Sequence, residues 1–214
     1  MKARSLLASV LIGLTCNVSA QGLPPTQLAE TATARMEHYK QEALKLAAPQ
    51  VFDEIERLRT IIALKNRGSA IPDLTDDDTL KAGGYASALE AKRNAKEPYG
   101  AYYWGRHNSR ICSVLETNKS TGDAGQRCWV ETFESFKIAS DGGIPRSSFN
   151  IGLMYENGWG VNKSKYIAAE WYIKAAEKYM IDGFREGALE AMEAALRVAP
   201  EHPAALRLKA RLLK

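Results

Sequence analysis

Hydrophobic residues recur three or four positions apart along most of this 214-residue chain, which is the spacing of one buried helix face. Before Pro49 the repeated positions are Met36, Tyr39, Ala43 and Leu46; after it they are Val51, Ile55, Leu58 and Ile62. Pro49 either kinks one long helix or separates two. No alternating run typical of a strand interrupts the pattern, so the sequence predicts an all-α protein.

The middle of the chain is punctuated by turn residues. Residues 69–84 are predicted as a linker, because they contain Pro72, an acidic run and the pair Gly83-Gly84. The aspartates at 76–78 could suggest calcium, but they lack the glycine and distal glutamate of an EF-hand loop. The favoured alternative is that Thr75 or Asp76 caps a short helix.

Two helices, 99–115 and 126–140, are predicted to form a hairpin. The second of them is expected to bury Val130, Phe133, Phe136 and Ile138 in part. Gly142-Gly143 and Pro145 then connect this hairpin to the next helix. Residues 85–141 are therefore interpreted as a degenerate helical hairpin.

The stretch from Ser147 to Tyr179 is the clearest helix, glycine turn, helix pattern in the chain. Small residues at fixed spacing would let its two helices approach closely, and large aromatics fill the space beside them. The residues expected to make this packing are Gly152, Tyr155, Gly158, Gly160, Ala169, Trp171 and Ala176.

This pattern resembles one Sel-like repeat, a variant of the tetratricopeptide repeat. Residues 142–181 carry the resemblance, and residues 165–214 are similar to a tetratricopeptide unit with a C-terminal capping helix. The helix at 165–181 would thus belong to both hairpins. In the last helix, Leu206, Ala210 and Leu213 are expected on the buried face. The resemblance implies a right-handed stack of antiparallel helical hairpins with an N-terminal helical extension, residues 21–68.

The N-terminus is typical of a secretory signal peptide, residues 1–20. Lys2 and Arg4 precede an apolar run from Leu6 to Leu14, and Val18-Ser19-Ala20 is a small-residue cleavage site. Cleavage after Ala20 removes two positive charges, so the net charge falls from +4 to +2, and no nucleic-acid partner is inferred. We expect a periplasmic or secreted protein without stable membrane insertion after cleavage.

Two cysteines remain in the mature chain, Cys112 and Cys128. In an oxidising compartment an isolated pair usually forms a disulfide, and no C-x-x-C spacing suggests redox catalysis. Such a bond would join the two helices of the 99–140 hairpin near their shared end. Closing a loop of this size stabilises the fold by roughly 3 kcal/mol in the chain-entropy model.

The sequence contains none of five common catalytic or nucleotide-binding motifs. The chain has no phosphate-binding loop, no G-x-G-x-x-G, no H-E-x-x-H, no G-x-S-x-G and no S-x-x-K. His38, His107 and His202 show no metal-ligand spacing. We therefore predict no catalytic residue, no metal, no cofactor and no enzymatic activity.

An aromatic and arginine-rich segment at 99–107 is the best candidate for a contact surface, since such residues dominate binding hot spots. Helical spacing favours Tyr99, Tyr103 and Trp104 as core. The candidate binding residues are Tyr102, Arg106 and, in the glycine turn, Trp159.

The function favoured by these patterns is non-catalytic binding of an unidentified protein or peptide. One alternative is an inhibitor or immunity-type protein that blocks a periplasmic effector. The resemblance implies another, an enzyme of cell-wall or β-lactam chemistry, although such relatives carry repeated cysteine pairs and this chain has one.

Overall fold

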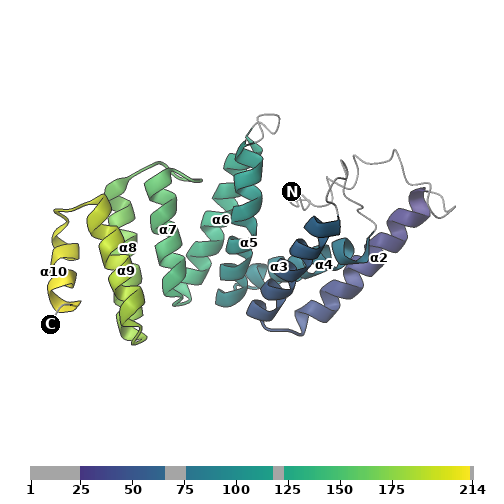
Figure 1. The fold of residues 1–214 in the computed structure, drawn as a ribbon, viewed down its shortest axis with the longest axis horizontal. Helices are drawn as coiled ribbons and strands as arrows, with labels where there is room; N and C mark the ends of the chain where they lie inside the picture. Colours follow the sequence, from purple (N-terminus) through teal and green to yellow (C-terminus); the bar gives the residue numbers. More distant parts are fainter. Residues whose placement is uncertain (1–24, 66–75, 118–122, 213–214) are drawn as a thin grey trace. The chain divides into compact units, whose positions relative to one another are not determined.

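The computed structural model describes residues 25–65, 76–117 and 123–212 of the chain. Within these ranges every regular element is an α-helix, which confirms the predicted all-α class (Figure 1). The helices are α2 (Pro25–Leu44), α3 (Ala48–Lys65), α4 (Asp77–Asn94), α5 (Pro98–Thr117), α6 (Ala124–Asp141), α7 (Pro145–Asn157), α8 (Lys165–Ile181), α9 (Arg185–Val198) and α10 (Pro203–Leu212). The predicted signal peptide lies outside the described residues. Among the described helices, none combines the length and apolarity needed to cross a membrane.

The chain divides into two compact units, Met1–Ala88 and Leu89–Lys214. The division falls inside α4, so the linker predicted at 69–84 is wrong over residues 77–84, which are helical. The glycines there serve close approach of helices. A Cβ atom on Gly84 would lie 2.6 Å from the backbone oxygen of Met36 in α2.

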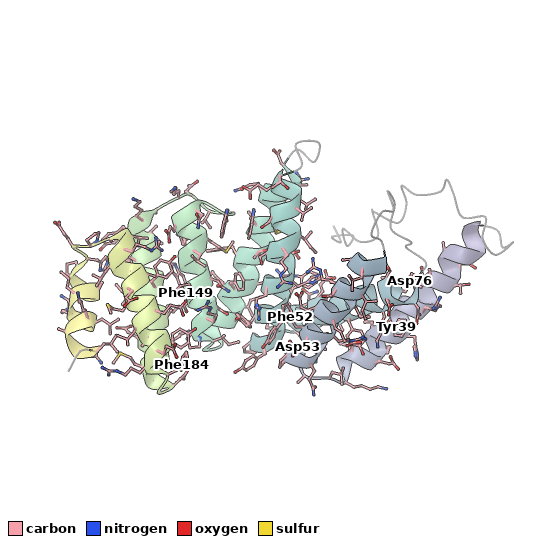
Figure 2. All side chains as sticks on the ribbon, in the orientation of Figure 1. Tyr39, Phe52, Asp53, Asp76, Phe149 and Phe184 are labelled. Atoms are coloured by element: carbon pink, nitrogen blue, oxygen red, sulfur yellow. A yellow bond between two sulfur atoms is a disulfide. The ribbon has the colours of Figure 1, made fainter. Side chains whose placement is uncertain are left out.

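In the N-terminal unit, Pro49 separates two helices. It lies in the first turn of α3, where the absence of an N–H group costs nothing. Asp76 caps α4 by accepting a hydrogen bond from the Asp78 N–H at 3.1 Å, as the cap interpretation predicts. Asp77 accepts from Tyr39 at 2.6 Å and pairs with Arg35, and Figure 2 shows Asp76 and Tyr39 in this region. These contacts account for two of the three aspartates without calcium.

Helices of the C-terminal unit pack chiefly on their neighbours in sequence: α5 on α6, α6 on α7, α7 on α8, and α8 on α9. Figure 1 shows these helices side by side in chain order. The helix α8 therefore contacts both α7 and α9, and α10 closes against α9 and α8.

Close approach between α7 and α8 depends on small residues. A Cβ atom on Gly152 would lie 2.6 Å from the fully buried ring of Tyr172. On α8, Ala169 and Ala176 are fully buried, and Phe149 of α7 packs against Tyr172 with 5.0 Å between ring centroids (Figure 2). Tyr155 and Trp171 are partly buried beside the same helices.

The turn after α7 is tied to the preceding hairpin. Gly158 ends α7 with φ 84° and its N–H bonds to the Met154 carbonyl. Gly160, with φ 68°, lies so close to α6 that a Cβ atom would be 2.5 Å from the carbonyl carbon of Trp129. Both positions need glycine, one for its backbone conformation and the other for conformation and space.

A disulfide joins α5 to α6 through Cys112 and Cys128, with 5.3 Å between their Cα atoms. Both cysteines are buried. The pairing is the one that the sequence predicts.

Two predicted burial patterns are wrong. In α10 the buried residues are Ala205, Leu208 and Leu212, whereas Leu206 is 47% exposed and Ala210 is exposed. Ala205, Leu208 and Leu212 pack into the apolar cluster formed by α8 and α9, and spacing within α10 alone does not specify which face meets that cluster. Leu213 lies outside the described residues. In α6, Val130 is 45% exposed, and the neighbouring Trp129 is buried instead.

Candidate functional site

A groove of about 550 Å³ opens along α5, α6 and α7 of the C-terminal unit. We call it the α5–α7 groove. Its lining residues are Tyr102, Arg106, Ser109, Arg110, Ser113, Trp129, Phe136, Arg146, Asn150, Leu153, Met154 and Trp159. Helical periodicity explains the set, because positions four and seven apart lie on one face of a helix. All three binding residues predicted from the sequence, Tyr102, Arg106 and Trp159, line this groove.

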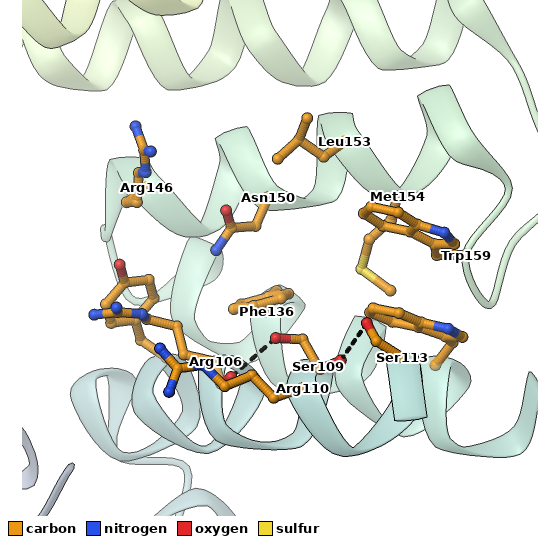
Figure 3. Close-up of a pocket in the computed structure, with 12 residues that line it drawn as sticks. Arg106, Ser109, Arg110, Ser113, Phe136, Arg146, Asn150, Leu153, Met154 and Trp159 are labelled. Atoms are coloured by element: carbon orange, nitrogen blue, oxygen red, sulfur yellow. Dashed lines mark hydrogen bonds between the residues drawn. The ribbon is translucent and has the colours of Figure 1, made fainter. Parts of the chain in front are cut away.

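One end of the groove is aromatic. Trp159 stacks on Trp129 with 4.9 Å between ring centroids and 8° between ring planes. The Trp129 Nε1–H donates to Glu116 Oε2 at 3.1 Å, which fixes the orientation of the indole. The close contact of Gly160 with the backbone of α6 fixes the position of the adjacent Trp159. The result is a rigid apolar wall with Met154 beside it (Figure 3).

The opposite end is cationic. Arg106 lies over the rings of Tyr102 and Tyr103, at 5.8 and 5.9 Å from their centroids. Arg146 of α7 lies 4.7 Å from the centroid of Phe149 and pairs with Glu190 of α9 at 2.8 Å. Figure 3 shows Arg106, Arg110 and Arg146 at the end away from Trp159, with the Arg146 side chain pointing away from the other two.

Burial and charge act in opposite directions on Arg146. Partial burial lowers the pKa of its guanidinium, and the Glu190 carboxylate raises it. The net shift of the Arg146 pKa is upward. Arg146 therefore stays charged at any physiological pH, as does arginine in general.

The serine hydroxyl groups on the groove floor donate hydrogen bonds to backbone carbonyls. Ser109 Oγ donates to the Arg106 carbonyl at 2.9 Å, and Ser113 Oγ donates to the Ser109 carbonyl at 3.1 Å (Figure 3). Each hydroxyl is therefore bonded to a backbone carbonyl of its own helix, α5. The groove therefore offers shape, aromatic surface and positive charge, which are the means of binding.

The aromatic segment at 99–107 divides between core and surface. Trp104 and His107 are buried, while Tyr103 is partly buried. Tyr99 is 61% exposed and does not line the groove, so its predicted place in the core is wrong. It stands one residue after Pro98 in the first turn of α5, before the helix packs fully on α6.

Sequence reasoning missed the contribution of α7 and α6 to the groove. Arg146, Asn150 and Leu153 follow helical spacing on α7, and Trp129 and Phe136 are seven apart on α6. That spacing was a usable signal of a shared face. Which faces of three helices meet is a tertiary property that spacing does not specify.

A second, smaller pocket of about 420 Å³ lies beside the start of α10. The His202 ring contacts Tyr166 with 4.9 Å between centroids and 40° between ring planes, and both ring nitrogens of His202 are enclosed and lack a hydrogen-bond partner. Since protein encloses both nitrogens, a ligand in this pocket could not reach them. The α5–α7 groove is therefore the stronger candidate.

Comparisons with protein-family models, with curated proteins and with solved structures give no match to this chain. Among the described residues, no three His, Cys, Asp or Glu side chains are grouped to hold a metal ion.

Proposed function

We propose that this protein binds a peptide or a segment of another protein in the α5–α7 groove and does not catalyse a reaction. The observation that carries the proposal is the convergence of stacked tryptophans, tyrosine and arginine in one concave surface. These are the residue types that dominate binding energy at protein interfaces. Their rings present large area at a low cost in conformational entropy.

The proposed architecture behind this groove is a stack of antiparallel hairpins of the Sel-like and tetratricopeptide kind. Its support is the contact of each helix from α5 to α9 with its sequence neighbours, and the use of α8 by two hairpins. Stacked hairpins expose long grooves whose side chains are set by packing below.

The proposed place of action is the periplasm or the cell exterior. The signal-like residues 1–20 motivate this proposal, and the Cys112–Cys128 disulfide supports it, because such bonds persist in oxidising compartments.

The test is selection from a displayed library of random peptides on the full mature chain, followed by affinity measurement by fluorescence anisotropy. We expect Trp159→Ala and Tyr102→Ala each to weaken binding of selected peptides by roughly 30-fold, the effect of a hot-spot side chain. Tyr99→Ala is the matched control, because this exposed tyrosine is also on α5 but does not line the groove.

Circular dichroism of each variant separates lost binding from lost fold. If selected peptides bind the folded Trp159→Ala and Tyr102→Ala variants as tightly as the parent, the groove is not the site. If no peptide is enriched over a bovine serum albumin surface, peptide binding is wrong.

A further inference from the structure

The two ends of the α5–α7 groove differ in their chemistry. On α7, Arg146 is at one end, and Met154 lies eight residues later at the other. A helix rises 1.5 Å per residue, so these positions are separated by about 12 Å. Figure 3 shows the same order, with Arg146 and Arg106 at one end and Met154 and Trp159 at the other.

Charge follows the same axis. Among the described residues that line the groove, three are arginines, Arg106, Arg110 and Arg146, and none is aspartate or glutamate; Glu190, the ion-pair partner of Arg146, lies on α9 outside the lining. At the aromatic end, the Glu116 carboxylate accepts a hydrogen bond from the Trp129 indole at 3.1 Å. A carboxylate on a ligand is thus attracted to the arginine end and repelled from the tryptophan end.

We infer that the occupant of the α5–α7 groove is an extended acidic peptide, with a carboxylate side chain at the arginine end and an apolar side chain against Trp159 and Met154. This inference rests on the proposed function and adds the ligand's chemistry and spacing. An extended chain advances about 3.3 to 3.6 Å per residue, so 12 Å corresponds to a spacing of roughly three positions, from residue i to residue i+3 of the peptide.

Single-stranded nucleic acid fits this arrangement less well. Its phosphates repeat along the whole strand, and proteins that bind it track them with a continuous basic groove. Here the arginines occupy one end, and Phe136, Leu153 and Met154 supply apolar surface between that end and Trp159.

The experiment uses labelled peptides with a Glu-Ser-Ser-Phe core in Gly-Ser flanks, titrated with the full mature chain. Comparison peptides carry Gln-Ser-Ser-Phe, Glu-Ser-Ser-Ala, and Ser-Glu-Phe-Ser, in which the two side chains are adjacent. We expect each comparison peptide to bind roughly tenfold more weakly, which is the scale of one charge-assisted contact or one buried ring.

A charge-reversal substitution at the arginine end is the second part of the experiment. Arg110 is exposed, so Arg110→Glu is expected to fold. It replaces one positive charge at the arginine end by a negative one while Arg106 and Arg146 remain, so it should abolish the preference for Glu-Ser-Ser-Phe over Gln-Ser-Ser-Phe. Arg207→Glu is the matched control, an exposed arginine on α10 outside the groove. Circular dichroism again verifies the fold.

Each outcome decides the inference. A preference for Glu-Ser-Ser-Phe that Arg110→Glu abolishes and Arg207→Glu retains supports it. Equal binding of all four peptides overturns it and leaves peptide binding in the groove intact, whereas binding of none of them, nor of any library peptide, overturns both. Tighter binding of a thymidine oligonucleotide of equal length overturns it in favour of nucleic acid.

Discussion

Single glycines in this protein determine how closely helices pack. Gly152 faces the ring of Tyr172. A Cβ atom at this position would lie within 3 Å of the ring carbon atoms. Tyr172 is fully buried and cannot swing away. Gly83 differs, because a Cβ atom there would meet only the terminal methyl of Met36 at 2.9 Å.

We predict that Gly152→Ala lowers the free energy of unfolding by about 1 to 2 kcal/mol. Overpacking costs about 1 to 3 kcal/mol, and the better helix propensity of alanine offsets part of it. Gly83→Ala is the control and should be neutral or stabilising, since the end of Met36 can move. Urea unfolding followed by circular dichroism measures both variants. Equal effects of the two substitutions would contradict the assignment of close packing at Gly152.

Glu156 links three helices. Its carboxylate accepts a hydrogen bond from the Tyr172 hydroxyl of α8 at 2.6 Å and from Arg197 Nη2 of α9 at 2.8 Å. The Arg197 hydrogen bond lowers the pKa of Glu156, partial burial opposes that shift, and the Tyr172 hydrogen bond lowers the pKa further. The ionised form is therefore favoured in the folded protein.

A lowered folded-state pKa means that Glu156 stabilises the fold above its ordinary value near 4.5 and loses this contribution as pH falls through the folded pKa. We predict that Glu156→Gln costs about 1 kcal/mol at pH 7, since Arg197 is largely exposed and its contribution is screened. The difference from the parent should shrink below the ordinary glutamate pKa. Unfolding curves across this pH range measure it, with the exposed Glu170→Gln as control. A difference that stays constant with pH would exclude an ionic contribution.

At the scale of elements, the α5–α6 hairpin has a covalent tie in addition to its packing. Cys112 and Cys128 are 16 positions apart, and the hairpin also holds Gly105 against Phe136, where a Cβ atom would lie 2.7 Å from the ring. The groove takes five of its lining residues from α5 and two from α6. The disulfide thus secures the two helices that form the groove floor.

Reduction of the disulfide should lower the free energy of unfolding by about 3 kcal/mol, because the unfolded chain regains loop entropy. Urea unfolding of the chain from residue 21 onward, with and without reductant, gives the difference. A Cys112→Ser, Cys128→Ser double variant is the control and should not respond to reductant. Mass spectrometry without reduction should find the two cysteine peptides linked, and free thiols would refute the bond.

Sequence patterns predicted elements with local signals better than those fixed by tertiary contacts. Pro49, the Asp76 cap and the Gly158 turn act within a few residues. The sequence predicts the Gly158 turn outright and, for Pro49 and the cap, two alternatives that include the observed one. The sequence predicts Gly83-Gly84 as part of a linker, because the neighbour that requires glycine at position 84, the backbone of α2, is more than 40 positions away. The same limit explains the difference in the buried face of α10 and the four groove residues that α7 supplies.

At the scale of the molecule, the interior helices of the C-terminal unit are more buried than its last helix. The helix α8 packs on α7 and α9 and has Ala168, Ala169, Tyr172, Ala175 and Ala176 fully buried. The terminal helix α10 has one buried face and contacts only α9 and α8 among the principal contacts of this unit. Local opening is easiest where few buried contacts must break.

Hydrogen exchange should therefore be slowest in the interior of α8 and distinctly faster in α10. Mass spectrometry of peptic peptides covering 165–181 and 203–212 measures the two rates within one sample, so each serves as reference for the other. Equal protection of both helices would mean that the unit opens as a whole, not from its end.

The contact of Gly160 with the Trp129 carbonyl has a consequence for the exchange of helical hairpins between proteins. A hairpin can be exchanged between chains only where its boundary surfaces are generic, and this boundary accepts nothing larger than a hydrogen atom. A graft of α7 and α8 alone would lack the part of α6 that the turn after α7 contacts. Because the disulfide also joins α6 to α5, the smallest transferable block is residues 98–181, and chimaeras cut between α6 and α7 should lose the position of Trp159 first.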